Sequence, residues 1–119
     1  MSNAARHYAQ TATAAMSPRE LEASALLKAA ARLQAAADGD GPATIQDALD
    51  HNRRLWTVFA GSVSDPASKL PEDVRARILA LADFVFNRTL LAQGKAEAAD
   101  LSVLVRINRE LASGLRANS

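Results

Sequence analysis

Two asparagines, Asn52 and Asn108, occupy positions at which helical spacing otherwise places apolar residues, so they are the first candidates for specific chemistry. An amide that is buried without a hydrogen-bond partner costs roughly 1–3 kcal/mol, and each asparagine therefore needs one. A direct Asn52–Asn108 pair, or a bond to an exposed carbonyl, would fix the register of two helices. The alternative is that the apolar seam containing them opens to bind a partner helix.

Arginines lie beside these asparagines, within a motif Asn-Arg-x-Leu that occurs three times at unequal intervals. Their aliphatic stems could cover apolar surface while the guanidinium groups stay in water. They could instead ring a groove and bind the carboxylates of a partner protein. The arginines concerned are Arg53, Arg54 and Arg109.

Aromatic residues are few, and Trp56 is the single tryptophan. Its spacing is that of a core residue, but an indole that partly reaches the surface would be the best interface anchor in the chain. Tyr8 is the one large apolar side chain of the segment 3–15, which either docks through it or forms a mobile arm. The candidate partner-binding residues are therefore Tyr8, Asn52, Arg53, Arg54, Trp56, Asn108 and Arg109.

No other residues form a reactive constellation. The absence of cysteine excludes a disulfide framework, a Cys-zinc site and a thiol nucleophile. The run Asp38-Gly39-Asp40 resembles the start of a calcium loop but lacks the required glycine and the final glutamate, and His7 and His51 share no ligand spacing. We therefore expect no cofactor, no bound metal and no enzymatic activity.

Charge and hydropathy restrict the partners. Lys and Arg number 14 against 13 Asp and Glu, and no segment forms a basic stripe, which argues against direct contact with nucleic acid. No apolar run approaches the roughly 18 residues of a membrane span, and no charged-then-apolar leader opens the sequence. These features predict a cytoplasmic protein that does not contact the membrane.

The elements that must position these residues are helices. Alanine, the best helix former, supplies 27 of the 119 residues, and no segment alternates as a strand would. We expect one all-α domain over residues 1–119: an antiparallel bundle of four main helices plus a short N-terminal helix. The predicted parts are an N-terminal arm or helix (1–16), a bundle core (17–115) with helices near 18–37, 42–61, 71–94 and 97–115, and a frayed tail (116–119).

Local signals support these bounds. Ser17 can cap a helix that has Pro18 at its first position, and Gly94 is a plausible terminating glycine. An apolar stripe is predicted in each main helix. In order, the stripes are Leu21, Ala25, Leu26, Ala29, Ala30 and Leu33; Ile45, Leu49, Asn52, Trp56, Phe59 and Val63; Val74, Ile78, Leu81, Val85 and Arg88 with Phe84 beside them; and Leu101, Leu104, Asn108, Leu111 and Leu115 with Val105 and Ala112.

Several blocks, in order along the chain, make it similar to the FlaF family of bacterial flagellar biosynthesis regulators. An N-terminal tyrosine, Tyr8, is followed by SPRELE at 17–22, ALDHNRRLW at 48–56, LPEDVRARI at 70–78 and INREL at 107–111. The Asn-Arg-Arg-Leu-Trp block is the most specific of them. The blocks span nearly the whole chain.

The resemblance implies a role in the synthesis and export of flagellin, the filament subunit, with flagellin itself bound as by a chaperone. It also implies a companion regulator, FlbT, as a further partner. We expect a helical segment of flagellin to lie in a groove between the helix near 42–61 and the helix near 97–115, with Trp56 as the anchor and Arg53, Arg54 and Arg109 on the rim. The alternatives are an RNA-binding regulator of flagellin mRNA and a non-catalytic adaptor between flagellin and the companion regulator.

Overall fold

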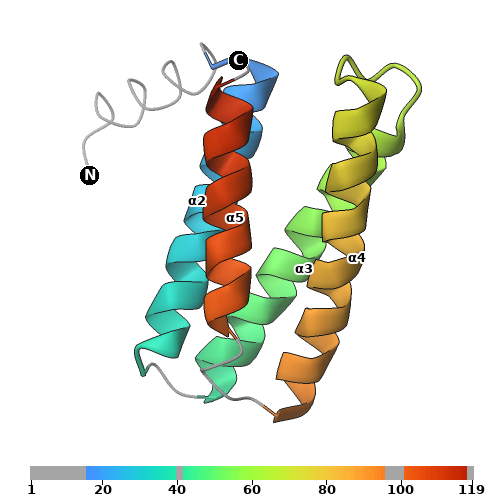
Figure 1. Cartoon of the computed structure of the whole chain (residues 1–119). Coiled ribbons are helices and arrows are strands. Elements are labelled where there is room, and N and C mark those ends of the chain that lie inside the picture. The colour runs from blue at the N-terminus through green and yellow to red at the C-terminus, as the bar shows by residue number, and fades with distance from the viewer. Residues whose placement is uncertain (1–15, 40–41, 96–100, 118–119) are drawn as a thin grey trace, which may run out of the picture.

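The computed structural model describes residues 16–39, 42–95 and 101–117, and these form four α-helices without a strand. The helices are α2 (Pro18–Ala37), α3 (Pro42–Ser64), α4 (Glu72–Lys95) and α5 (Leu101–Ala117). Each runs opposite to the one before it (Figure 1). The predicted all-α class with four main helices is confirmed, whereas the predicted N-terminal helix and Tyr8 lie outside the described residues.

The first main helix begins where the sequence predicts. Ser17 has extended backbone angles, and its Oγ accepts a hydrogen bond of 3.2 Å from the backbone N–H of Glu20. This bond satisfies one of the amides left without a partner at the start of a helix, and Pro18 needs none. At the other end Gly39 has φ +119°, a conformation that favours glycine, and it turns the chain away from the helix.

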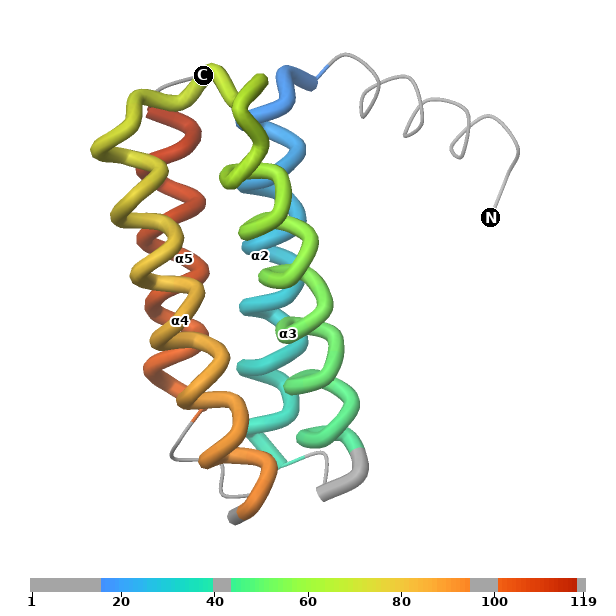
Figure 2. The backbone as a smooth tube through the Cα atoms, turned by 90° about the vertical axis from the view of Figure 1, so that its right-hand side faces the viewer, coloured from blue at the N-terminus to red at the C-terminus, as the bar shows by residue number. Residues whose placement is uncertain are grey.

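The four helices surround one core but do not close into a complete ring. Helix α2 packs against α5 on one side and against α3 on the other, and α4 packs against α3. By contrast, α4 and α5 approach each other at only a few points. Figure 1 shows α2 with α5 and α3 with α4 as two pairs, and the turned view in Figure 2 shows the four helices running side by side along the bundle. The bundle is therefore open along its α4–α5 side.

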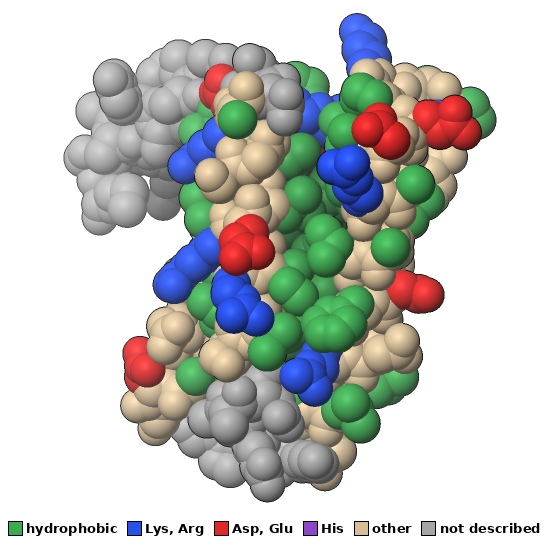
Figure 3. Space-filling model, viewed as in Figure 1, with side chains coloured by type: hydrophobic (Ala, Val, Ile, Leu, Met, Phe, Trp, Pro, Cys, Tyr) green, Lys and Arg blue, Asp and Glu red, His purple; other side chains and the backbone are tan. Residues whose placement is uncertain are grey.

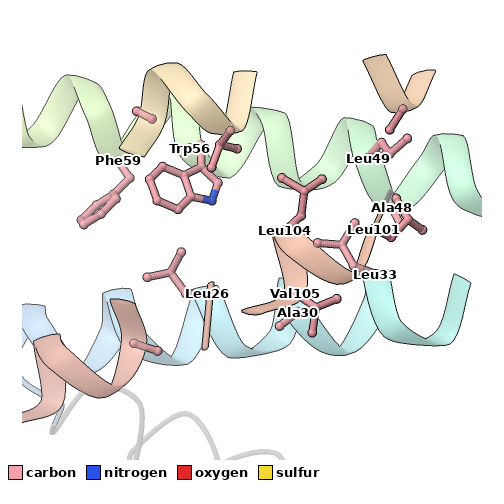
Figure 4. Packing of buried hydrophobic residues seen from close by; sticks show 14 of the residues in the cluster. Leu26, Ala30, Leu33, Ala48, Leu49, Trp56, Phe59, Leu101, Leu104 and Val105 are labelled. Carbon is pink, nitrogen blue, oxygen red and sulfur yellow. The ribbon is translucent and has the colours of Figure 1, made fainter. Parts of the chain in front are cut away.

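The core is rich in small side chains, and Figure 4 shows part of it. Helix α2 contributes four buried alanines and two leucines, so α5 can lie close against it. The predicted stripe of α3 is buried at every position. The buried residues of α2 are Ala23, Leu26, Ala29, Ala30, Leu33 and Ala36, and those of α5 are Leu101, Leu104, Val105, Asn108, Ala112 and Leu115.

Some predicted stripes are rotated or shifted. Leu21 is 40% exposed, because the buried face of α2 turns toward Ala23 and Ala36 instead. In α4 the buried line passes through Ala82 and Thr89, which leaves Leu81 at its edge. Both helices carry apolar residues over more than one face, so their periodicity does not specify a single stripe.

The helix ends also differ from the predicted ones. Helix α3 continues past Gly61 to Ser64, and α4 passes through Gly94, the predicted terminator, to Lys95. Helix α5 includes Arg116 and Ala117, which the sequence places in the frayed tail. A glycine within a helix costs only about 1 kcal/mol, which neighbouring turns offset, and a basic residue in the last turn favours continuation.

Candidate functional site

A groove of about 630 Å³ lies along the open side between α4 and α5. Ile78 and Leu115, both buried, form its floor. Its walls are half-buried apolar residues from the facing flanks of the two helices: Val74 and Leu81 from α4, and Ile107 and Leu111 from α5. Figure 3 shows apolar side chains continuing along this side of the molecule between the two helices.

Charged side chains stand at the rim of the groove. Arg19, Lys69 and Arg77 lie at the end formed by the start of α2, the α3–α4 loop and the first turns of α4, and Glu110 lies on α5. Arg19 pairs with Glu22 at 2.6 Å. Neither Lys69 nor Arg77 has an ion-pair partner within the described part of the chain, so their charges are available at the rim.

The shape of the groove suits a helix. The lining residues of α5 run from Ile107 to Leu115, which corresponds to about 12 Å, or two helical turns. An amphipathic helix presents apolar side chains at a spacing of three and four residues over the same length. The walls offer it half-buried aliphatic surface, whose burial is favourable at about 25 cal/mol per Å².

The two asparagines form a buried network with Trp56 away from this groove. The indole Nε1–H of Trp56 donates to Asn108 Oδ1 at 3.0 Å. Asn108 Nδ2 donates to Asn52 Oδ1 at 2.8 Å and to the backbone carbonyl of Leu26 at 3.3 Å. The Asn108 amide thereby joins α2, α3 and α5. The two kinds of bond that the sequence left as alternatives, a direct Asn52–Asn108 pair and a bond to a backbone carbonyl, are both present. Within the described residues Asn52 Nδ2 is the one amide nitrogen of the pair without a hydrogen-bond partner.

This network corrects the predicted anchor. Trp56, Asn52 and Asn108 are each 0% exposed, so a partner cannot contact them in this structure. The indole packs edge-on against Phe59, with the ring centres 5.9 Å apart. The groove therefore does not lie between α3 and α5 with Trp56 as its anchor, because these residues fill the interior instead.

The predicted arginine rim is not assembled around the groove either. Arg53 and Arg54 both pair with Asp50, at 2.8 and 2.9 Å, on the surface of α3. The hydrogen bond from Arg53, together with the nearby positive charges, lowers the pKa of Asp50. Arg109 is exposed on α5, and none of these three arginines lines the groove.

A second, shallower apolar surface lies between α2 and α3. Its volume is about 250 Å³, and it includes Leu21 and Val58, which are 40% and 72% exposed. Glu22 stands at its edge, where burial raises the pKa of the carboxyl group against the opposing effect of Arg19. This surface lies on helices that do not form the walls of the α4–α5 groove.

The described residues form neither a cluster of metal ligands nor a membrane-spanning helix. No three His, Asp or Glu side chains come together there as metal ligands could. None of the four helices is long and apolar enough to cross a membrane. His51 lies partly buried on α3, and its burial, with the positive charges of Arg32 and Arg54, lowers its pKa below 6.5.

The residues of the groove walls stand out in the sequence, but as core residues and not as the lining of a groove. Val74, Leu81 and Leu111 belong to predicted core stripes, and Ile107 belongs to a block shared with the resembling family. A stripe wider than one face can serve the core, a groove or both. Only the separation of α4 from α5 assigns these residues to a groove.

Comparison with known proteins identifies a family for nearly the whole chain. A family model described as flagellar protein FlaF matches residues 4–115. No curated protein and no solved structure matches the chain.

Proposed function

The chain belongs to the FlaF family of flagellar proteins, and we propose that it promotes flagellin synthesis and export by binding a helical segment of unpolymerised flagellin in the cytoplasm. The observation that carries this proposal is the apolar groove between α4 and α5. The terminal helices of an unassembled filament subunit have apolar faces that would otherwise associate. A groove with half-buried walls can cover such a face until export.

Two further features support a binding rather than a catalytic function. The groove is lined by aliphatic side chains with charges only at its rim, which is the composition of a surface for another protein. Its walls are already partly exposed in the free protein, so a partner helix would cover them without first opening the buried network of Trp56 and Asn108.

A larger side chain at a residue that lines the groove tests the proposal, because it would occupy the space that the flagellin helix needs. Gly114 lines the groove, and a Cβ added there meets no atom within 4 Å apart from those of its own turn of helix. Gly114→Leu should therefore place an isobutyl group in the groove while the helix gains propensity. Gly61→Leu is the matched control, because Gly61 is an equally open helical glycine on α3 outside both apolar surfaces.

The measurement is binding of each purified variant to monomeric flagellin from the same bacterium, with circular dichroism to show that the helices persist. We expect Gly114→Leu to weaken binding at least tenfold and Gly61→Leu to leave it unchanged. Equal binding by both variants would place the flagellin site elsewhere. Failure of the unsubstituted protein to bind flagellin would contradict the function itself.

Salt distinguishes this function from direct RNA binding. Contacts with phosphates weaken steeply as salt rises, whereas burial of apolar surface does not. We expect the affinity for flagellin to fall by no more than about tenfold between 50 and roughly 300 mM salt, because apolar burial supplies most of it and salt screens only the charges at the rim. A flagellin mRNA leader bound tightly at low salt and lost across the same range would favour the RNA-binding alternative.

An adaptor function is the second candidate, and the apolar surface between α2 and α3 favours it. A protein with two separate apolar surfaces can hold flagellin at one and the companion regulator FlbT at the other. Val58→Asp, which places a charge on the second surface, would then abolish binding of the companion regulator but not of flagellin. Loss of neither partner would leave the adaptor function without support.

A further inference from the structure

The flank of α4 that borders the groove carries two arginines, Arg77 within the groove lining and Arg88 beyond it. Arg88 follows Arg77 by eleven residues, which is about three helical turns, so the two arginines lie on nearly the same face of α4 as Leu81. The separation along the helix axis is about 16 Å. Arg77 lines the groove itself, and Arg88 lies further along the same flank.

Neither of these guanidinium groups is neutralised within the described residues. No carboxylate pairs with Arg77 or Arg88 there. The Arg88 side chain lies over the ring of Phe84, with its guanidinium carbon 5.7 Å from the ring centre, and its buried Nε has no hydrogen-bond partner.

The opposite side of the groove has a different charge. Glu110 is the charged residue that α5 contributes to the lining, and the α5 wall is otherwise formed by Ile107, Leu111, Gly114 and Leu115. The groove therefore has Arg77 on its α4 side and Glu110 on its α5 side, and Arg88 extends the positive charge along α4 beyond the lining. This asymmetry favours a partner helix with acidic residues on the flank that faces α4.

We propose that the segment bound in the α4–α5 groove is an amphipathic helix with two carboxylates about eleven residues apart on one flank, which pair with Arg77 and Arg88. The inference rests on the proposed function, since it specifies the chemistry of the flagellin segment. Arg guanidinium groups bind carboxylates through two parallel hydrogen bonds, so the pair would fix the position of the bound helix along α4. The apolar face of the same helix would cover Leu81 and Leu111.

The test uses two synthetic peptides of 22 residues with the same leucine stripe. One carries glutamates eleven residues apart beside the stripe, and its twin carries glutamines at those positions. Each is titrated against the full chain and against Arg77→Glu, Arg88→Gln and Arg109→Glu. Arg109→Glu is the matched control, because Arg109 is an exposed helical arginine of α5 outside the groove.

We expect the acidic peptide to bind the unsubstituted chain about tenfold more tightly than its twin, because two partly exposed charge pairs each contribute modestly. Arg77→Glu should abolish this preference, Arg88→Gln should reduce it, and Arg109→Glu should preserve it. Replacing the glutamate that faces Arg77 by lysine should restore binding to Arg77→Glu. Should Arg88→Gln fail to fold, Arg77→Glu and its lysine rescue decide the result alone.

Other outcomes would overturn the inference. The two peptides could bind equally well, or neither could bind. Arg109→Glu could lose the preference for the acidic peptide while Arg77→Glu keeps it. The chain could also associate with itself through this face, which Arg77→Glu would then abolish. A parallel titration with monomeric flagellin separates the two proposals. Flagellin binding without a preference for the acidic peptide would reject the inference and keep the function, and the reverse would keep the acidic ligand and reject flagellin as the partner.

Discussion

The two flanks of α5 differ in what they contact. One flank packs closely against the alanine-rich face of α2 and carries Asn108, whose amide is bonded to residues of α2 and α3. The other flank, with Ile107 and Leu111, faces α4 across an open groove. A single helix thus contributes to a closed interface and to an open groove.

The difference shows how a small chain with few large side chains can keep a binding surface. Alanines on α2 let α5 approach closely, so one side of the bundle is filled with little bulk. The buried amide network then adds directional bonds that hold α2, α3 and α5 together. Helix α4 packs mainly on α3, and the large apolar residues between α4 and α5 stay available for a partner.

The largest effect is expected from removing the indole of Trp56, which lies where α2, α3 and α5 pack together. Trp56→Ala should lower the free energy of unfolding by about 3–5 kcal/mol, because it leaves a large cavity and removes the donor to Asn108. Chemical denaturation measures the change. A variant that keeps its stability but loses flagellin would instead support the anchor role predicted from the sequence.

A pair of leucines on α5 sharpens the comparison. Leu104 is fully buried, whereas Leu111 is half-buried in the groove wall. Leu104→Ala should cost about 2–5 kcal/mol of stability, and Leu111→Ala about 1 kcal/mol, since much less of its surface leaves water on folding. Leu111→Ala should weaken flagellin binding more than Leu104→Ala does, when both variants are measured at a temperature well below their unfolding midpoints. Equal stability costs would mean that the groove is closed in solution.

Alanine at Gly114 probes the open space directly. Gly114→Ala should raise the stability of the chain by about 0.5–1 kcal/mol, because alanine has the higher helix propensity and its Cβ meets nothing. Gly39→Ala should have the opposite sign, since its φ of +119° strains any residue with a Cβ. Thermal unfolding of both variants checks the two signs. A destabilised Gly114→Ala variant would show that the groove is narrower in solution.

The smallest expected effect concerns His51. Its pKa lies below 6.5 in the folded chain, mainly because of burial, so the unfolded chain binds more protons between that lowered value and 6.5. Stability should therefore rise as the pH rises through this window. His51→Gln should flatten that part of the profile in denaturation measured from pH 5 to 8. An unchanged slope would assign it to another group.

The closed side of the molecule could largely be predicted from the sequence, and the open side could not. The six residues of the apolar stripe that the sequence predicts in α3 are all buried. A side-chain amide at such a position needs a hydrogen-bond partner, and Asn52 and Asn108 bond to each other. Ser17 likewise specified the start of α2. In these cases the local pattern and the final environment agree.

The groove exists because α4 and α5 stand apart. The spacing of apolar residues along one helix does not specify how far that helix lies from another. Leu81 and Leu111 have the spacing of core residues and are half-buried, because α4 stands away from α5. Trp56 shows the converse case, since an aromatic with the spacing of core residues can be an anchor or a core residue, and in the structure it is buried and bonded to Asn108. Tyr8 lies outside the described residues, and its predicted role stays a prediction.

Trp56, the single tryptophan, is fully buried and is therefore a convenient fluorescence probe of the protein interior. Excitation of Trp56 reports on the interior where α2, α3 and α5 meet, and its emission should move to longer wavelength only when that interior admits water. A ligand seated between α4 and α5 would leave the spectrum unchanged. Fluorescence can therefore measure unfolding in the presence of a tryptophan-free ligand, and any shift at saturation would reveal that the interior rearranges.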